Sequence, residues 1–81
     1  MRYDFSNEAA KAVSNMDTAT AGRVIKGIMG LPGKGDVKPM EGCSDGRMRL
    51  RVGGYRVVFK LLEDGGTLII IDIGPRGDIY K

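Results

Sequence analysis

The sequence contains no histidine and only one cysteine, Cys43, and these gaps exclude several kinds of chemistry. Without histidine, the chain lacks the usual general base, the usual metal ligand and the central member of a serine or cysteine triad. One cysteine cannot form an internal disulfide, so a reducing compartment is expected. No cluster of ligand side chains has the spacing of a zinc site, and no acidic cluster suits magnesium-dependent phosphoryl chemistry. We therefore expect neither a metal ion nor a cofactor.

Long apolar runs are also missing. The longest, Leu68 to Ile71, is far too short to cross a bilayer, and the N-terminal residues show no signal-peptide pattern. The glycine-rich segments lack the spacing of a P-loop or of a dinucleotide-binding fingerprint. We expect a cytoplasmic protein without membrane contacts. The length of 81 residues and the hydrophobic content of 42% predict a single small domain, residues 1–81.

The sequence does contain an alternating segment, from Gly46 to Leu62, that carries most of the excess positive charge. Basic and apolar residues alternate on both sides of Gly53-Gly54, a pattern that predicts two antiparallel strands joined by a tight turn. If Val52 lies opposite Tyr55, the cations share one face. The predicted basic face carries Arg47, Arg49, Arg51, Arg56 and Lys60. The predicted apolar face carries Met48, Leu50, Val52, Tyr55, Val57 and Phe59.

This uneven charge favours a polyanionic partner. Residues 1–45 have no net charge, whereas residues 46–81 have a net charge of +3. Positive charge concentrated on one sheet face is typical of proteins that bind nucleic acid. A solvated face, or a binding surface without catalysis, is the alternative explanation.

The segment before the hairpin predicts a short strand and two helices. Residues 2–5 are expected to form the strand. Ser6 and Asp17 are expected to cap helices over residues 7–15 and from Asp17 to about Met29, which form an antiparallel hairpin. Residues 31–45 are rich in glycine, proline and aspartate and predict a loop. Two lysines of this loop either contact phosphates beside the hairpin or lie in solvent: Lys34 and Lys38.

The segment after the hairpin completes the expected α+β fold. Residues 67–73 are apolar on both faces and predict a central strand, in which Asp72 is a candidate partner for an arginine. Residues 74–81 are expected to form a short tail. The predicted architecture is an N-terminal strand, a two-helix hairpin and a three-stranded antiparallel meander in one sheet. Both helices cover the apolar face and leave the basic face open.

The side chains that remain for catalysis are arginine, lysine, tyrosine and a few carboxylates. This set suits cleavage of RNA by its own 2′-hydroxyl, because the substrate supplies the nucleophile. The enzyme then needs to orient the RNA, assist proton transfer and stabilise the pentacovalent phosphorane, and the guanidinium group suits the last task. Nearby arginines would lower the pKa of a tyrosine from its usual value of about 10, which makes tyrosine a credible base. DNA has no 2′-hydroxyl and is excluded as a substrate of this reaction.

Three segments resemble the RelE toxins of the RelE/ParE superfamily: MEG at residues 40–42, RLRVGGYRVV at residues 49–58, and IGPRGDIYK at residues 73–81. The resemblance implies a RelE-like fold and the toxin of a type II toxin–antitoxin system. It implies an mRNA interferase, a ribosome-dependent endoribonuclease that cuts mRNA without metal by 2′-hydroxyl attack and inhibits translation. The implied partners are a cognate antitoxin, the ribosome and mRNA. The alternatives are a ParE-like, non-enzymatic gyrase inhibitor and an inactive relative that binds only RNA or its antitoxin.

Carried over residue by residue, the resemblance implies catalytic roles for four residues. Arg49 stabilises charge near the scissile phosphate, Arg56 holds that phosphate, and Arg76 stabilises the transition state or leaving group. Tyr80 is the implied general base. The sequence departs from the family pattern at Pro75, where many relatives carry histidine, and this departure leaves proton transfer to Tyr80. RNA contacts are expected from Arg47, Arg51, Lys60 and Lys38.

Overall fold

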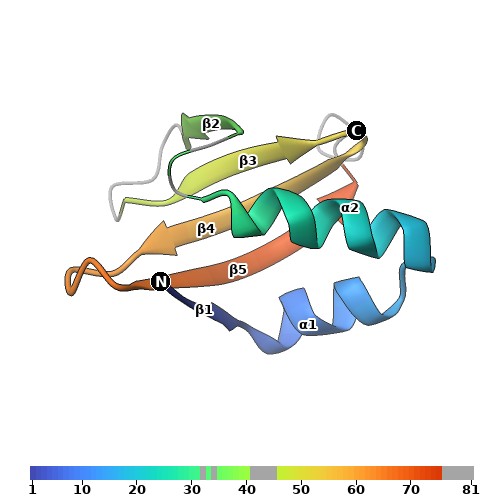
Figure 1. Ribbon diagram of the computed structural model, residues 1–81, viewed down its shortest axis with the longest axis horizontal. Helices are drawn as coiled ribbons and strands as arrows, with labels where there is room; N and C mark the ends of the chain where they lie inside the picture. The colour runs from blue at the N-terminus through green and yellow to red at the C-terminus, as the bar shows by residue number, and fades with distance from the viewer. Residues whose placement is uncertain (32, 34, 41–45, 76–81) are drawn as a thin grey trace.

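The computed structural model describes residues 1–31, 33, 35–40 and 46–75, which form two helices and a five-stranded sheet (Figure 1). The sheet has the order β1-β5-β4-β3-β2. Its first pair, β1 with β5, is parallel, and the other three pairs are antiparallel. The predicted α+β fold is confirmed. The elements are β1 (Arg2–Phe5), α1 (Asn7–Ser14), α2 (Thr18–Met29), β2 (Asp36–Pro39), β3 (Met48–Val52), β4 (Tyr55–Leu61) and β5 (Thr67–Pro75).

Both helices begin at the predicted N-caps. The Ser6 hydroxyl accepts a hydrogen bond from the Ala9 N–H at 3.0 Å, and the Asp17 carboxylate accepts one from the Thr20 N–H at 3.1 Å. Each bond satisfies a donor that the first helical turn cannot pair internally. The chain reverses between α1 and α2, so the two helices form the expected hairpin (Figure 1). Neither described helix is long and apolar enough to cross a membrane.

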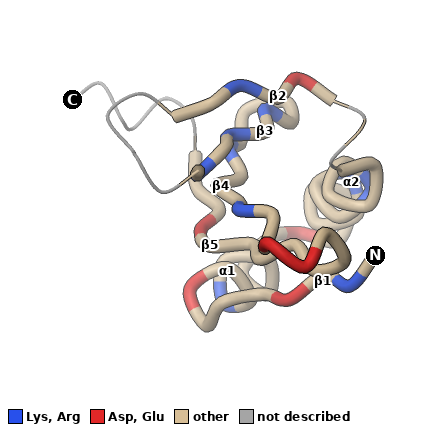
Figure 2. The backbone as a smooth tube through the Cα atoms, turned by 90° about the vertical axis from the view of Figure 1, so that its left-hand side faces the viewer, with Lys and Arg blue, Asp and Glu red and all other residues tan. Residues whose placement is uncertain are grey.

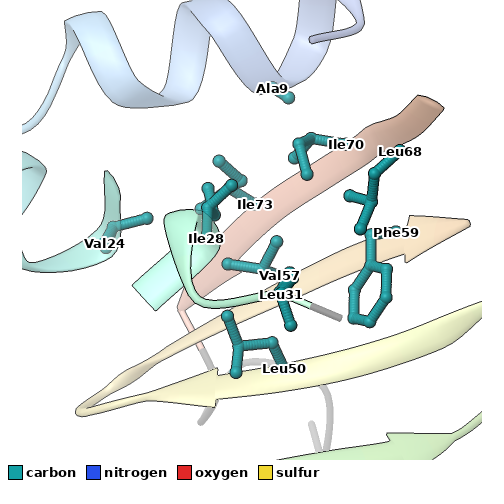
Figure 3. Close-up of a cluster of buried hydrophobic side chains, with 10 residues drawn as sticks. All are labelled: Ala9, Val24, Ile28, Leu31, Leu50, Val57, Phe59, Leu68, Ile70 and Ile73. Atoms are coloured by element: carbon teal, nitrogen blue, oxygen red, sulfur yellow. The ribbon is translucent and has the colours of Figure 1, made fainter. Parts of the chain in front are cut away.

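The core lies between the helices and one face of the sheet. Ala9 of α1 and Val24 and Ile28 of α2 point toward the strands (Figure 3). The alternate residues of β3 and β4 that were predicted to face the helices are buried there, with Leu50, Val57 and Phe59 at most 2% exposed. Three residues of β5 complete this sheet face: Leu68, Ile70 and Ile73. Both helices cover this face of the sheet. The opposite face is the open face, and it carries the cations of β3 and β4.

Two expectations about irregular segments were wrong. The predicted loop over residues 31–45 contains β2, which pairs antiparallel with β3 and places Val37 opposite Leu50. The predicted tail does not begin at Gly74, since β5 continues to Pro75 opposite Tyr55 of β4. In both places a neighbouring strand supplies the hydrogen-bonding partners, which local sequence does not reveal. The predicted central position of the last strand is confirmed, because β5 lies between β1 and β4.

A bulge in β5 decides which residues of this strand face the core. The register against β4 shifts at Ile71, which has no partner in β4. The extra residue reverses the alternation, so Ile70 and Ile73 are both buried while Asp72 lies on the open face. Ser6 clamps this bulge, because its N–H donates to the Ile70 carbonyl at 2.9 Å and its hydroxyl donates to the Ile71 carbonyl at 2.6 Å.

Candidate functional site

The β3–β4 hairpin has the register that the sequence predicted. Val52 lies opposite Tyr55 and Arg51 lies opposite Arg56, with Gly53 in the turn at a φ of 55°. Like charges directly opposite each other in neighbouring strands are destabilising, so the arginine pair is unfavourable for the isolated sheet. An anionic partner on this face would offset that repulsion.

Cations from three adjacent strands meet at a pocket on the open face. The pocket has a volume of about 360 Å³ and is lined by Lys38, Pro39, Met40, Arg49 and Arg56. Lys38 of β2 lies directly opposite Arg49 of β3, and Arg56 comes from β4. The blue segments of β2, β3 and β4 lie beside one another in the sheet (Figure 2). Three predicted site residues are thus brought together, although Lys38 was expected in a loop.

One hydrogen-bond donor of Arg56 is unsatisfied. Its Nε atom is buried and has no acceptor within the described part of the chain. A buried donor without a partner costs free energy, and a donor on a charged group costs more than a neutral one. A phosphate in the pocket that Arg56 lines would bring opposite charge to the guanidinium group.

The other predicted RNA-binding residues lie around the pocket on the same side of the sheet. Arg51 is exposed, and its Nε lies 3.8 Å from the carboxylate of Asp36 on β2, an exposed ion pair that contributes little stability. Lys60 is half-buried in β4 opposite Ile69. Arg47 is exposed directly before β3. These positions are compatible with RNA contacts, which stay predictions.

The predicted arginine partner of Asp72 is absent from the described residues. The Asp72 carboxylate accepts a hydrogen bond from the N–H of Ile73 at 2.9 Å, and its side chain is exposed on the open face. Arg76 and Tyr80, to which the resemblance assigns charge stabilisation and proton transfer, lie outside the described residues. Their roles therefore stay predictions. Two other residues considered from sequence also lie outside the described part: Lys34 and Cys43.

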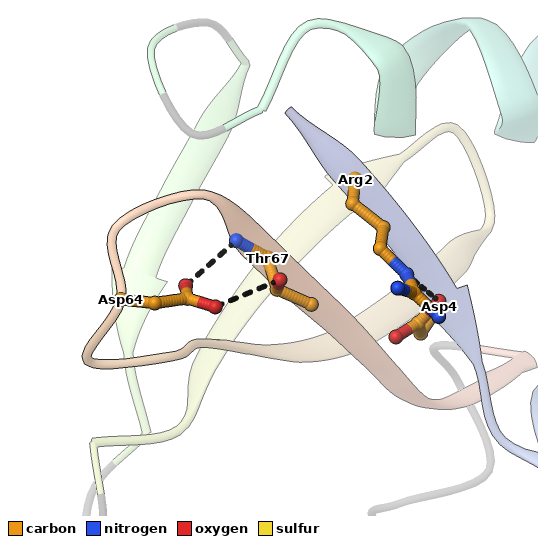
Figure 4. Close-up of polar contacts among 4 residues, drawn as sticks. All are labelled: Arg2, Asp4, Asp64 and Thr67. Carbon is orange, nitrogen blue, oxygen red and sulfur yellow. Dashed lines mark hydrogen bonds and ion pairs between the residues drawn. The ribbon is translucent and has the colours of Figure 1, made fainter.

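Within the described part of the chain, two carboxylates have a clearly lowered pKa, and both serve local structure. Hydrogen bonds from Thr20 lower the pKa of Asp17, the N-cap of α2. In the turn before β5, the Gly66 N–H and then the Thr67 hydroxyl lower the pKa of Asp64, which also accepts from the Thr67 N–H at 3.0 Å (Figure 4). The same figure shows the exposed ion pair of Arg2 and Asp4, 3.0 Å apart. Among the described residues, no group of three or more histidine, cysteine or carboxylate side chains could hold a metal ion.

Sequence reasoning missed the apolar part of the pocket wall. Pro39 and Met40 line it together with the cations, but the sequence marked Met40 only as part of a family motif. Local sequence carried no signal for it, because the face on which Met40 lies is set only by the pairing of β2 with β3. Once β2 pairs with β3, every second residue from Lys38 returns to the open face.

Known proteins share both the sequence pattern and the fold. Residues 3–80 match the family described as the ParE toxin of the type II toxin–antitoxin system parDE. No curated protein matches the chain. Among solved structures, the archaeal RelE–RelB complex from Pyrococcus horikoshii OT3 contains a chain with 25% identity and a TM-score of 0.74, and the match covers 94% of each chain.

Two further structures show the same fold at lower identity. The RelB–RelE antitoxin–toxin complex from Methanococcus jannaschii matches with 24% identity and a TM-score of 0.75, over 95% of this chain and 94% of the other. The isolated E. coli RelE toxin matches with 20% identity and a TM-score of 0.74, over 98% of this chain and 89% of the other. Since the family match spans nearly the whole sequence, the chain belongs to the ParE toxin family of type II toxin–antitoxin systems, within the RelE/ParE superfamily.

Proposed function

We propose that this toxin is a ribosome-dependent mRNA endonuclease that cleaves by attack of the RNA 2′-hydroxyl, without a metal ion. The observation that carries the proposal is the pocket in which Lys38, Arg49 and Arg56 converge from three adjacent strands. A scissile phosphate in this pocket would lie among three cations. Cleavage of ribosome-bound mRNA requires that the toxin acts in the cytoplasm.

The chemistry follows from the charges around the phosphate. The 2′-oxygen attacks phosphorus, the bond to the 5′-oxygen breaks, and the products are a 2′,3′-cyclic phosphate and a 5′-hydroxyl. The phosphorane gains negative charge on its equatorial oxygens, and cations that are already in position stabilise it without reorganisation. In this proposal Tyr80 accepts the proton of the 2′-hydroxyl, and Arg76 stabilises the charge that develops on the leaving oxygen, which then takes a proton from water to give the 5′-hydroxyl.

The test is to induce the toxin without an antitoxin and to determine the chemistry of the mRNA ends. We expect new 5′ ends that carry a hydroxyl and become ligatable only after phosphorylation. Ends that carry a 5′-phosphate would contradict 2′-hydroxyl attack. Arg56→Ala and Arg49→Ala should each reduce the cleavage rate by roughly 10²-fold or more, the usual cost of removing one preorganised charge-stabilising group. The matched control is Lys26→Ala, which removes an exposed cation from α2 on the opposite side of the sheet and should leave cleavage unchanged.

We also propose a cognate antitoxin as the partner of this chain. The solved complexes from P. horikoshii and M. jannaschii each contain an antitoxin with the toxin. An acidic segment that folds on binding would complement the basic face. Coexpression of the neighbouring small reading frame should restore growth, and a purified complex should elute as one species.

Gyrase inhibition is the second candidate function, and the match to the ParE family favours it. A protein contact of this kind would need the fold but not the charge-stabilising pocket. Blocked supercoiling by purified gyrase, together with intact mRNA after induction, would decide for this candidate. Growth inhibition that persists in Arg56→Ala would also support gyrase inhibition.

A further inference from the structure

A backbone hydrogen bond fixes Met40 beside the pocket that Lys38, Arg49 and Arg56 line. Its N–H donates to the Arg47 carbonyl at 3.1 Å, which continues the β2–β3 pairing one residue beyond Pro39. Lys38 and Met40 are two residues apart and therefore lie on the same face of the sheet. Met40 thus occupies a defined position beside Lys38, although it follows the end of the strand.

The Met40 side chain does not belong to the core. It is half-buried, yet it is neither in the buried cluster nor among the described side chains that pack against that cluster, whereas Met48 of β3 is. It lines the pocket on the open face instead, next to Pro39. The residues that line the pocket are therefore of two chemical kinds, cationic and apolar.

These two kinds of lining residue match the parts of one nucleotide. A nucleotide joins an anionic phosphate to a flat base with apolar faces, and base faces are commonly bound by stacking or by contact with polarisable side chains. The pocket volume of about 360 Å³ lies at the lower end of the range for small-ligand sites, which is roughly 300–1,000 Å³. One nucleotide is therefore a suitable occupant.

We propose that the pocket holds one nucleotide of the RNA, with its phosphate on the cations and its base against Met40. The inference rests on the proposed function only in taking RNA as the ligand. Met40 then positions the base and thereby holds the neighbouring phosphate between Lys38, Arg49 and Arg56. This contact gives affinity without hydrogen bonds to the base, because the Met40 thioether is only a weak acceptor.

The test uses the five methionine methyl groups as reporters. Protein labelled with ¹³C at the methionine methyls is titrated with adenosine 3′-monophosphate, ribose 5-phosphate or inorganic phosphate and followed by NMR. We expect the Met40 methyl signal to move upfield with the nucleotide alone, because the ring current of the base acts only when a base lies above it. Met29 on α2, which is 61% exposed, is the internal control and should not move. Equal shifts of Met40 with all three ligands would overturn the base contact.

Variants provide an independent measurement. Met40→Ala should weaken binding of the nucleotide about tenfold, the loss expected when much of an apolar contact is removed, and should leave phosphate binding within about twofold. Met40→Leu should retain most of the affinity for the nucleotide, and Met29→Ala should leave that affinity unchanged. Unchanged nucleotide affinity in Met40→Ala would refute the inference.

The inference and the proposed function can fail separately. A base-dependent Met40 signal in a toxin that leaves mRNA intact would refute nuclease activity and support the nucleotide site. If mRNA is cleaved to 5′-hydroxyl ends but the shift of the Met40 methyl signal is the same with and without a base, only the nucleotide site is refuted.

Discussion

Ser6→Ala tests how strongly one hydroxyl ties the helices to the strand that leads into the C-terminal motif. The hydroxyl accepts from the Ala9 N–H at 3.0 Å as the N-cap of α1, and it donates to the Ile71 carbonyl at 2.6 Å in the bulge of β5. Alanine removes both bonds. The N–H of residue 6 can still donate to the Ile70 carbonyl, so the effect is confined to the hydroxyl.

The two hydrogen bonds together determine how much stability Ser6→Ala should lose. Replacing an N-cap serine by alanine costs about 1 kcal/mol. A second hydrogen bond contributes about 1 kcal/mol net, and the partly buried Ile71 carbonyl would lose its side-chain donor. We therefore expect the free energy of unfolding to fall by about 2 kcal/mol, which corresponds to a melting temperature lower by roughly 8–16 °C in a domain of this size.

Urea unfolding followed by circular dichroism measures this loss, with the slope m as a check that only stability has changed. Ser14→Ala is the matched control, because its hydroxyl donates only to the Lys11 carbonyl on the exposed surface of α1. That change should stay within about 0.5 kcal/mol. Ser6→Thr keeps the hydroxyl and should restore most of the stability. If Ser6→Ala cost no more than Ser14→Ala, the clamp between α1 and the bulge would be refuted.

Three further predictions concern strain, acid and salt. Gly35→Ala should lower the free energy of unfolding by about 1–3 kcal/mol in urea unfolding, because Gly35 has a φ of 107° and an added Cβ would lie 2.6 Å from Cδ1 of buried Leu50; wild-type stability in this variant would contradict that packing. Asp64→Ala should destabilise the protein at pH 7, and this destabilisation should shrink as the pH is lowered below the unfolded pKa, as measured by unfolding curves over that range. The lowered pKa of Asp64 means that its contribution is present above the unfolded pKa of about 3.9 and is lost as pH falls through the lower folded pKa. Arg51→Ala should change stability by less than about 1 kcal/mol, since its ion pair with Asp36 is exposed. It should reduce the slope of log affinity for single-stranded RNA against log salt by about 0.7, and an unchanged slope would remove Arg51 from the RNA contacts.

The sequence by itself predicted the parts of the fold that depend on neighbours along the chain. Alternation on both sides of a glycine pair determined the hairpin register from Val52–Tyr55 outward, and hence the side of the sheet on which the arginines lie. Ser6 and Asp17 marked the helix starts because capping is a local hydrogen bond. The absence of histidine restricted the chemistry, and the resemblance supplied Arg76 and Tyr80, whose roles are still predictions.

Only the tertiary structure decided how the pocket is assembled. Residues 36–39 are too few, and too close to glycine and proline, to show a strand period, and they become β2 because β3 offers an edge with which they can pair. That pairing brings Lys38 opposite Arg49 and leaves Met40 on the open face. The bulge at Ile71, clamped from Ser6 some 65 positions earlier, likewise has no local signal. Periodicity along the chain records which face a residue prefers, but which strands become neighbours depends on contacts between distant segments, and the pocket is made from such contacts.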